Sequence, residues 1–546
     1  MRTFAASALA LVCLSSPSYA LEPWSDADPS KPPQRHEVGG LGVAVDAEYR
    51  AQFIDVTPLS LTTEDQSRFS VMEHRLRLGG TLDYEEKVKL TTSFDVLDGV
   101  LWGDNGAFGG VPAADSGMKV TIRSPNNAKA CMQPLPGADP LSANSYGFGL
   151  CDAPILKLRR AFVQVNTPIG AIRVGRQPVS IGMGVQNTDG DGRRNRFGVA
   201  YTGDSVDRIL FATKPLEAFK APENRNTEET RGLIVAGMYD RISNGSPIAL
   251  ADDVNQAAAA MRFLEPDAGA VRDLELMLFY AHRWNKTYDT RVHTVGSRAA
   301  FKVANLHAGI DVVGNLGTTR EVAAAYALIT NDPVTPQTIA QLGSRAVIRW
   351  DEPKFTGYLE FDYASGDADP QSRTPLTQFR FAEDTNVGLL MFKHAMYFQS
   401  ARASAAAVEV TRRLGADTFP AERINTRGAF TDAVAIFPQI DVRPHESVLL
   451  RGGVLVAWAP APVLDPVQSL TRRDGTNIED DLVNFVGGKP GRFYGAELDL
   501  RAQWRFVDHF ALDVEGALLL PGDAFQDVNG RASRSMLVQG RTTAFF

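Results

Sequence analysis

Charged side chains that recur at every second position are the residues of this sequence that could do chemistry. From Glu497 to Arg505 the odd positions are charged or polar and the even positions are apolar. A period of two places the two sets on opposite faces of a β-strand. Carboxylate and guanidinium groups on one face can line a hydrated passage and act on a solute through their field. The residues expected to line such a passage are Asp46, Glu48, Arg50, Arg75, Arg77, Lys89, Asp95, Arg159, Arg173, Arg345, Arg349, Glu360, Asp362, Arg451, Glu497, Asp499, Arg501, Arg505, Asp513 and Glu515.

The opposite faces are apolar, most clearly in the last fifty residues. Tyr494, Ala496 and Leu498 begin an alternating run, the pattern resumes after a break at 507–509, and the final run ends on Phe546. A charged face backed by a continuous apolar face suits a wall between water and lipid. A soluble β-sandwich also alternates, but its last strand rarely ends flush on phenylalanine. We therefore expect an all-β fold, a transmembrane antiparallel up-and-down β-barrel.

The first residues are typical of a secretory signal peptide. Arg2 is followed by an apolar stretch from Phe4 to Leu14 and by the small-x-small sequence Ser18-Tyr19-Ala20. We expect a signal peptide over 1–20, a flexible lead-in over 21–38, rich in Pro, Asp and Lys, and a single barrel over 39–546. The implied location is the outer membrane of a Gram-negative bacterium.

Bulk composition agrees with a barrel. The chain has 546 residues and a net charge of −8, with a mean hydropathy of −0.15. No stretch after the signal peptide is long and apolar enough for a membrane-spanning helix, so the choice lies between a soluble exported protein and a barrel, in which only alternate residues face lipid. Nothing in the charge balance indicates a nucleic-acid partner. The alternating runs continue without a linker, which favours one large domain.

The runs predict about 18 strands, joined alternately by short periplasmic turns and long extracellular loops. The two weakest segments are 206–213 and 257–264, and without them the count would be 16. A helical composition over Glu321–Ile329 predicts a helix in an outer loop. The long loops 104–152 and 366–427 could fold inward and narrow the barrel, with 147–149 at the tip. The expected strands are 41–53, 75–84, 88–102, 155–166, 170–182, 206–213, 231–241, 257–264, 273–285, 293–303, 306–316, 340–350, 354–365, 428–440, 447–459, 492–507, 509–520 and 534–546.

Aromatic residues fall at the expected ends of these strands. Such a distribution is typical of the girdles that barrels place at the two membrane interfaces. The residues expected at the outer interface are Trp102, Trp284 and Trp458, and those at the periplasmic interface are Trp350, Trp504 and Phe546.

Cysteines and acidic loops offer little cofactor chemistry. Cys131 and Cys151 share one long irregular segment of an exported chain, so we expect a disulfide that stiffens the loop, with two free thiols as the alternative. Two cysteines without clustered histidines make a poor zinc site. The acidic stretches 189–192 and 474–481 lack the complete spacing of a calcium-binding loop and read better as solvated turns. We expect no metal and no cofactor.

Three sets of residues resemble known porin families. Glu360-Phe361-Asp362-Tyr363-Ala364-Ser365-Gly366-Asp367 resembles the strand-end motif of alginate-export-type outer-membrane porins. The run Tyr494–Leu500 followed by Pro521-Gly522-Asp523 is similar to the end of that family. Leu158–Val163 with Ile172–Gln177 resembles the paired strands of general Gram-negative porins. The resemblance implies a single-chain barrel of about 18 strands with a polar lumen, without a complete set of alginate-contacting residues.

These observations predict a porin-like channel for passive passage of small polar or charged solutes. A structural or adhesive barrel with a closed lumen is the alternative. An outer-membrane esterase or phospholipase is a weaker one, because Gly203-Asp204-Ser205 lacks the glycine expected soon after a nucleophilic serine and no G-x-S-x-G or H-E-x-x-H run occurs. We expect no enzyme activity. The expected partners are outer-membrane lipid, the solutes, and the barrel-assembly machinery through the C-terminal strand; the sequence does not settle the oligomeric state.

Overall fold

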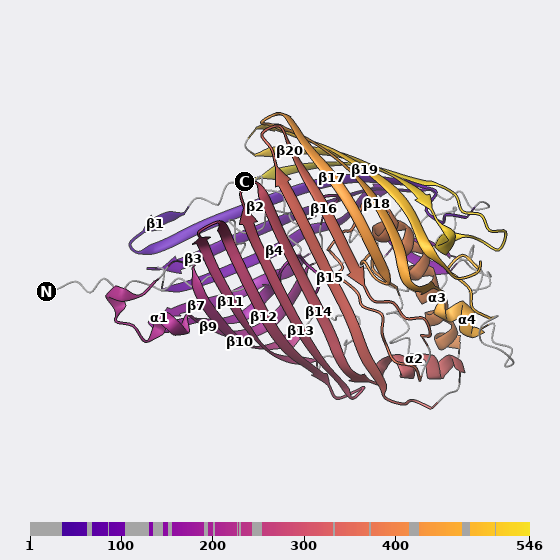
Figure 1. Ribbon diagram of the computed structural model, residues 1–546, viewed down its shortest axis with the longest axis horizontal. Helices are drawn as coiled ribbons and strands as arrows, with labels where there is room; N and C mark the ends of the chain where they lie inside the picture. The colour runs from indigo at the N-terminus through magenta and orange to yellow at the C-terminus, as the bar shows by residue number, and fades with distance from the viewer. Residues whose placement is uncertain are drawn as a thin grey trace.

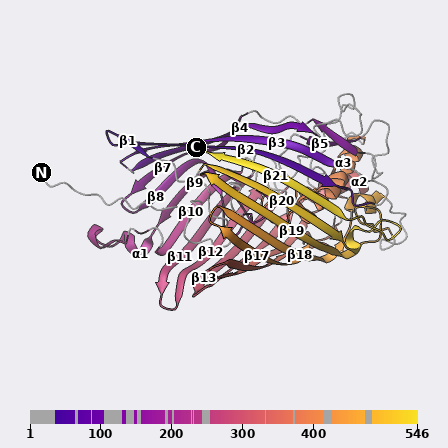
Figure 2. The ribbon, with the colours of Figure 1, turned by 90° about the horizontal axis from the view of Figure 1, so that it is seen from above.

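Antiparallel strands form one closed ring in the computed structural model of the chain (Figures 1 and 2). Each strand of the ring pairs with the next along the chain, and β2 (Leu41–Thr57) pairs with β21 (Ser535–Phe545) to close it. The described residues are 35–62, 68–85, 87–103, 130–134, 146–150, 156–189, 195–199, 203–226, 228, 231–242, 254–330, 333–370, 373–413, 425–471, 481–507 and 509–546. The expected signal peptide and most of the lead-in lie outside them.

The ring has eighteen strands, as the sequence predicts. The two weakest predictions both form strands, β9 and β11, so the alternative count of 16 is wrong. A short strand, β1 (His36–Val38), pairs only with β2, and β5 (Ala130–Pro134) pairs with β6 (Tyr146–Leu150) in a separate sheet. The remaining strands are β3 (Phe69–Tyr84), β4 (Val88–Gly103), β7 (Leu156–Thr167), β8 (Gly170–Val179), β9 (Asp204–Thr213), β10 (Gly232–Ile242), β11 (Asn255–Ala268), β12 (Val271–Asn285), β13 (Thr290–Val303), β14 (Leu306–Thr319), β15 (Gln337–Asp351), β16 (Phe355–Ala364), β17 (Ala433–His445), β18 (Val448–Val463), β19 (Gly491–Val507) and β20 (Phe510–Pro521).

Helices lie in the connections. Figure 1 shows α2, α3 and α4 at one end of the barrel and α1 with β1 at the other. The end with short turns is the periplasmic end of an outer-membrane barrel, and the end with long connections is the outer one. The predicted helix at 321–329 is confirmed as α2. None of the described helices is long and apolar enough to cross a membrane. The helices are α1 (Pro215–Ala218), α2 (Glu321–Thr330), α3 (Tyr397–Arg413) and α4 (Pro466–Thr471), with a π-helical segment at Met391–Met396 and 3-10 turns at Pro222–Asn224 and Asp523–Phe525.

The outer face of the ring is apolar. Along β12, Leu276, Leu278 and Tyr280 are exposed, whereas Met277 and Phe279 between them are buried. The same alternation recurs around the barrel and provides the surface that lipid requires.

Tryptophans sit near both edges of this apolar band. Trp350 and Trp504 are exposed at the short-turn ends of β15 and β19, together with Phe546. Trp458 is exposed toward the outer end of β18, and Trp284 is half-buried at the outer end of β12. Trp102 is the next-to-last residue of β4, and its side chain lies outside the described part.

One residue of the C-terminal pattern faces the other way. Tyr494 is only 1% exposed and points inward, although its place in the alternation predicts the lipid face. Gly495 adopts φ +120°, and the register shifts between Ala457 and Trp458 on the neighbouring strand. This bulge inverts the faces on its N-terminal side, so that Phe493 is outward and Tyr494 inward.

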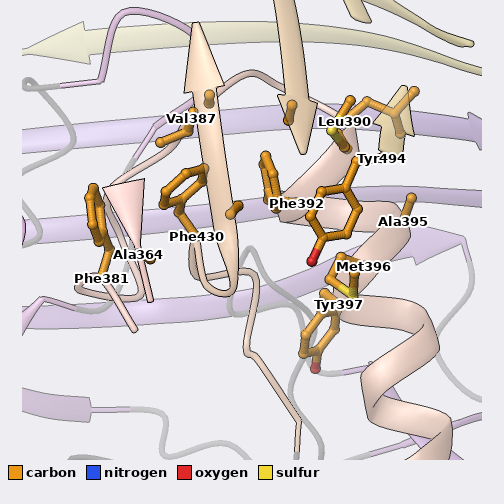
Figure 3. Close-up of a cluster of buried hydrophobic side chains, with 14 of the residues drawn as sticks. Ala364, Phe381, Val387, Leu390, Phe392, Ala395, Met396, Tyr397, Phe430 and Tyr494 are labelled. Carbon is orange, nitrogen blue, oxygen red and sulfur yellow. The ribbon is translucent and has the colours of Figure 1, made fainter. Parts of the chain in front are cut away.

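Two outer connections fold into the barrel. The segment after β8, residues 180–203, begins inside the strand predicted over 170–182, because β8 ends at Val179, and its described parts are largely buried against the inner wall. The segment after β16, residues 365–432, contributes Phe381, Leu390, Phe392 and Phe430 to a buried apolar cluster (Figure 3). This inward fold agrees with the prediction from the sequence that the loop 366–427 could fold into the barrel.

Candidate functional site

The inner wall is a network of ion pairs between neighbouring strands. Arg77 donates to both oxygens of Asp95, at 2.6 and 3.0 Å. Arg451 binds Asp441 in the same bidentate way, at 2.7 and 2.8 Å, and both side chains are 0% exposed. Arg501 and Arg541 share Asp513 and Glu515. Most of the inner charge is therefore compensated within the wall.

Arg196 fastens the 180–203 segment to this wall. Its guanidinium donates to Gln439 and, at 2.8 Å, to Asp441, and it lies 3.2 Å from the centroid of the Tyr358 ring. Its backbone carbonyl accepts hydrogen bonds from Arg451 at 2.6 Å and Arg501 at 2.8 Å. One residue of the loop thus binds four strands, β16 to β19.

The other end of this segment is fastened to the neighbouring strands β14 and β15. Asp311 of β14 accepts the backbone N–H of Met183, and Arg345 of β15 donates to the Met183 carbonyl at 3.2 Å. Asn386 of the second inward segment donates to the carbonyl of Phe197 at 3.0 Å. The two segments therefore support each other inside the barrel.

Glu497 holds the second segment. Its Oε1 accepts the backbone N–H groups of Leu389 and Leu390 at 2.7 Å each, and its Oε2 accepts that of Met391. These N–H groups precede or begin a helical segment, so they have no intrahelical acceptor and carry the positive end of its dipole. A carboxylate 1% exposed on the wall satisfies all three.

An aromatic cluster stabilises the second segment beyond this hydrogen bonding. Phe392 lies edge-on to Phe430 with ring centroids 4.8 Å apart and to Tyr494 at 5.4 Å. Figure 3 shows Phe430 between Phe381 and Phe392, with Tyr494 reaching the cluster from the wall. The hydroxyl of Tyr494 donates to the Asp432 carbonyl at 3.0 Å. The inversion at Gly495 is what allows the wall to supply this anchor.

A chamber lies between the 180–187 stretch and the wall formed by β9 to β13. Its apolar lining includes Met277, Phe279 and Ala260, and its charged lining is mainly arginine. The charged groups that line it are Arg208, Arg262, Glu275, Arg283 and Arg298.

Arg283 is the unusual member of this set. Arg208 forms a bidentate pair with Asp240, and Arg262 and Arg298 both bind Glu275. Arg283 donates instead to the neutral Gln256 carbonyl oxygen, at 3.1 and 3.0 Å. No carboxylate of the described residues forms an ion pair with Arg283, although Asp204 and Asp240 lie near enough to interact with its charge.

The residues expected to line a passage share the inner face of the ring. Arg50 and Arg75 bind Glu48, Arg345 binds Glu360 and Asp362, and Arg173 donates to Gln164. The set does not converge on one point: Lys89, Arg349 and Arg505 lie toward the short-turn end, far along the strands from the inward segments. Some of these residues therefore form ion pairs between neighbouring strands, and others bind the inward-folded segments.

The alternation of apolar and polar residues in the sequence did not identify the chamber or Arg196 as functional features. On β12 the inner residues Met277, Phe279 and Ala281 are as apolar as the outer ones, so alternation alone did not assign a face to Arg283. Glu275 and Arg283 are eight residues apart, and an even spacing places two residues on the same face of a strand. This spacing is the signal that could have placed both side chains on the inner face. Arg196 lies in a loop, where no periodicity exists to indicate its direction.

Several other candidates lie elsewhere. Ser205 is buried in β9, and its hydroxyl donates to the Arg159 carbonyl at 3.4 Å. The Asp189 carbonyl accepts from Arg159 at 2.9 Å. The expected disulfide cannot be placed, because Cys151 lies outside the described residues, and the side chains at 147–149 do too. Within the described part of the chain, no group of three or more His, Cys, Asp or Glu side chains could hold a metal ion.

A closed antiparallel ring with an apolar outer face, a charged inner wall and inward-folded outer loops is the architecture of an outer-membrane β-barrel. Residues 471–539, from the end of α4 into β21, match the model of the alginate export family. No curated relative matches the sequence.

Solved structures of similar topology include several outer-membrane proteins. OccD3 (OpdP) of Pseudomonas aeruginosa shares 11% identity at a TM-score of 0.46, covering 97% of this chain and 98% of that chain. OccAB1 of Acinetobacter baumannii shares 10% at 0.46, covering 92% and 96%. OprD of Pseudomonas aeruginosa shares 8% at 0.44, covering 96% and 97%.

Proposed function

We propose that the protein is a channel for the passive passage of small polar or charged solutes, rather than an enzyme. The observation that carries the proposal is the Arg283 chamber, a cavity inside the ring that holds a guanidinium with no ion-pair partner among the carboxylates of the described residues. A buried scaffold would gain from compensating this charge, as it does for Arg451 and Arg208.

The positive charge of Arg283 favours a solute with negative charge. An anion next to Arg283 gains about 1 kcal/mol at 4 Å even in bulk water, and more where the walls exclude water. The neighbouring Met277 and Phe279 would contact an apolar part of the same solute. We therefore propose that anions are held here during passage and that cations are disfavoured.

A barrel with a closed lumen is the second candidate, because the two inward segments pack a shared apolar core with Val185, Phe197 and Phe392. In this alternative the ion pairs and the core serve stability alone. Single-channel recording separates the two candidates: refolded protein in a planar bilayer should give conductance steps, and the absence of steps from folded protein would favour the closed barrel.

Reversal potentials across a salt gradient test the role of the chamber. Arg283→Gln should lower the permeability of anions relative to cations by roughly fivefold, the equivalent of about 1 kcal/mol. Arg291→Gln is the matched control, because Arg291 lies at a similar height on the outer face of the adjacent strand, with its side chain 68% exposed. An unchanged reversal potential in Arg283→Gln would contradict the assignment of the chamber.

A further inference from the structure

The outer edge of the wall formed by β12, β13 and β14 carries a cluster of cations on the membrane side. Lys286 and Arg320 are exposed, and Arg291 is 68% exposed in its side chain. Asp289, bound to Arg291 at 3.1 Å, is the acidic member of the set. We refer to Lys286, Asp289, Arg291 and Arg320 as the rim patch, which has three positive charges and one negative.

The rim patch is held together by the backbone. The turn 286–289 joins β12 to β13, and the Arg320 N–H donates to the Tyr288 carbonyl at 3.0 Å, which brings the end of β14 beside the turn. Asn285 caps the turn by accepting the N–H of Thr287 at 2.7 Å. Three strands that Figure 1 shows side by side therefore place their cations at one edge.

Directly below the patch is a layer of aromatic and imidazole rings on the outer face. His282 and His293 are paired across β12 and β13 with ring centroids 4.5 Å apart, and Trp284 stacks on His282 at 5.4 Å. The Tyr280 hydroxyl and His293 Nδ1 are 2.7 Å apart. Amphipathic rings of this kind lie at the headgroup level of a membrane, so the rim patch is at the height of the headgroups of the outer leaflet.

Two other exposed or partly exposed cations toward the outer rim, Arg176 and Arg68, are matched by acids. Arg176 binds both oxygens of Asp207, and Arg68 binds Asp55. In contrast, neither Lys286 nor Arg320 forms an ion pair with a carboxylate of the described residues. A surplus of cations at headgroup height favours an anionic lipid, because phosphate oxygens accept hydrogen bonds from several Lys and Arg side chains at once.

We propose that the rim patch binds the phosphate-bearing headgroup of a lipid in the outer leaflet. Lys286, Arg291 and Arg320 donate to the phosphate, while the rings of Trp284 and His282 lie against the upper part of the lipid. This site is on the lipid side of the wall and does not depend on whether the barrel conducts.

Native mass spectrometry of the full-length refolded barrel, in detergent micelles with a bis-phosphorylated diglucosamine lipid, tests the proposal. We expect one lipid to remain bound, and the dephosphorylated lipid to be retained at least fivefold less. The triple variant Lys286→Gln, Arg291→Gln, Arg320→Gln should reduce retention of the phosphorylated lipid by a similar factor. Arg272→Gln is the matched control, since Arg272 is exposed on the same face of β12 at the opposite end.

Folding is checked for every variant by the heat-dependent shift of barrel mobility in electrophoresis. Equal retention by a folded triple variant, or equal retention of phosphorylated and dephosphorylated lipid, would overturn the proposal. So would full displacement of the lipid by millimolar inorganic phosphate, which would assign the patch to a free anion. Single-channel conductance of the triple variant is expected to match the wild type, which keeps this test distinct from that of channel activity.

Discussion

Glu497 and Leu390 are joined by a hydrogen bond of 2.7 Å from the Leu390 N–H to Oε1 of the Glu497 carboxylate. The bond crosses from an inward-folded loop to the barrel wall, and the two flanking N–H groups bind the same carboxylate. A helical segment that would otherwise end in unsatisfied donors is thereby fixed inside the ring. The position of the inward segment follows from the chemistry of one wall residue.

Replacing Glu497 should release this segment. Glu497→Leu leaves three buried N–H groups without an acceptor, each at a cost of about 1–3 kcal/mol. We expect larger and longer conductance steps in planar bilayers and a lower unfolding temperature in detergent. Glu446→Gln, in an exposed periplasmic turn, is the control. Wild-type conductance and stability in Glu497→Leu would show that the segment is held by its apolar contacts alone.

Gly343 gives an independent way to disturb the same segment. A Cβ at this position would lie 2.2 Å from the Phe379 ring, whereas a Cβ at Gly314 on the adjacent strand meets nothing closer than 3.7 Å. Gly343→Ala should displace Phe379, which is fully buried, and cost about 1–3 kcal/mol by overpacking. Gly314→Ala should be neutral. Thermal unfolding of both variants checks the prediction, and equal unfolding temperatures would contradict it.

The strands could be predicted from the sequence because a barrel wall separates two solvents. Apolar or small residues alternate with polar ones from Val538 to Arg541, because each side chain contacts either lipid or the interior of the barrel. The same alternation predicted β9 and β11, although their patterns are weaker. The helix at 321–330 was also predictable, from composition alone. Alternation fails only where the backbone breaks the period, as at the Gly495 bulge.

The contents of the barrel could not be predicted in this way. Arg196 lies in a loop whose direction depends on Asp441, Gln439 and Tyr358, residues more than 150 positions away in the sequence. The pairing of Arg451 with Asp441, rather than with any other acid, follows from register across β17 and β18. Such long-range contacts carry no local signal, so the sequence indicated a charged interior without its partners.

The Arg451–Asp441 pair should respond differently to single and double substitution. Arg451→Leu removes a buried, bidentate partner of Asp441 and leaves its ion pair with Arg196 in place, and breaking a buried pair costs about 3–5 kcal/mol. The double variant Arg451→Leu, Asp441→Leu should recover part of this loss, because the buried carboxylate is removed together with its bidentate partner. A double-mutant cycle on unfolding in urea measures the coupling. Additive losses would show that the two side chains act independently.

Asp432 should make stability depend on pH. Asp432 lies in the loop before β17, where burial raises the pKa of its carboxyl to about 8. The Ala461 N–H, which donates to this carboxyl at 3.1 Å, lowers the pKa. The nearby Asp367 raises the pKa further, and Arg492 lowers it. Between about pH 4 and pH 8 the folded state then keeps a proton that the unfolded chain releases, so this group's contribution to stability falls as pH rises through that window.

Asp432→Asn keeps an acceptor for the Ala461 N–H and cannot ionise, and asparagine tolerates the φ of +45° at this position. We expect the unfolding temperature of the wild type to drop more between pH 5 and pH 8 than that of Asp432→Asn. Asp289→Asn, at an exposed position with φ +47°, is the matched control and should keep the wild-type pH dependence. Identical pH profiles for the wild type and Asp432→Asn would mean that Asp432 is ionised in the folded protein at pH 5.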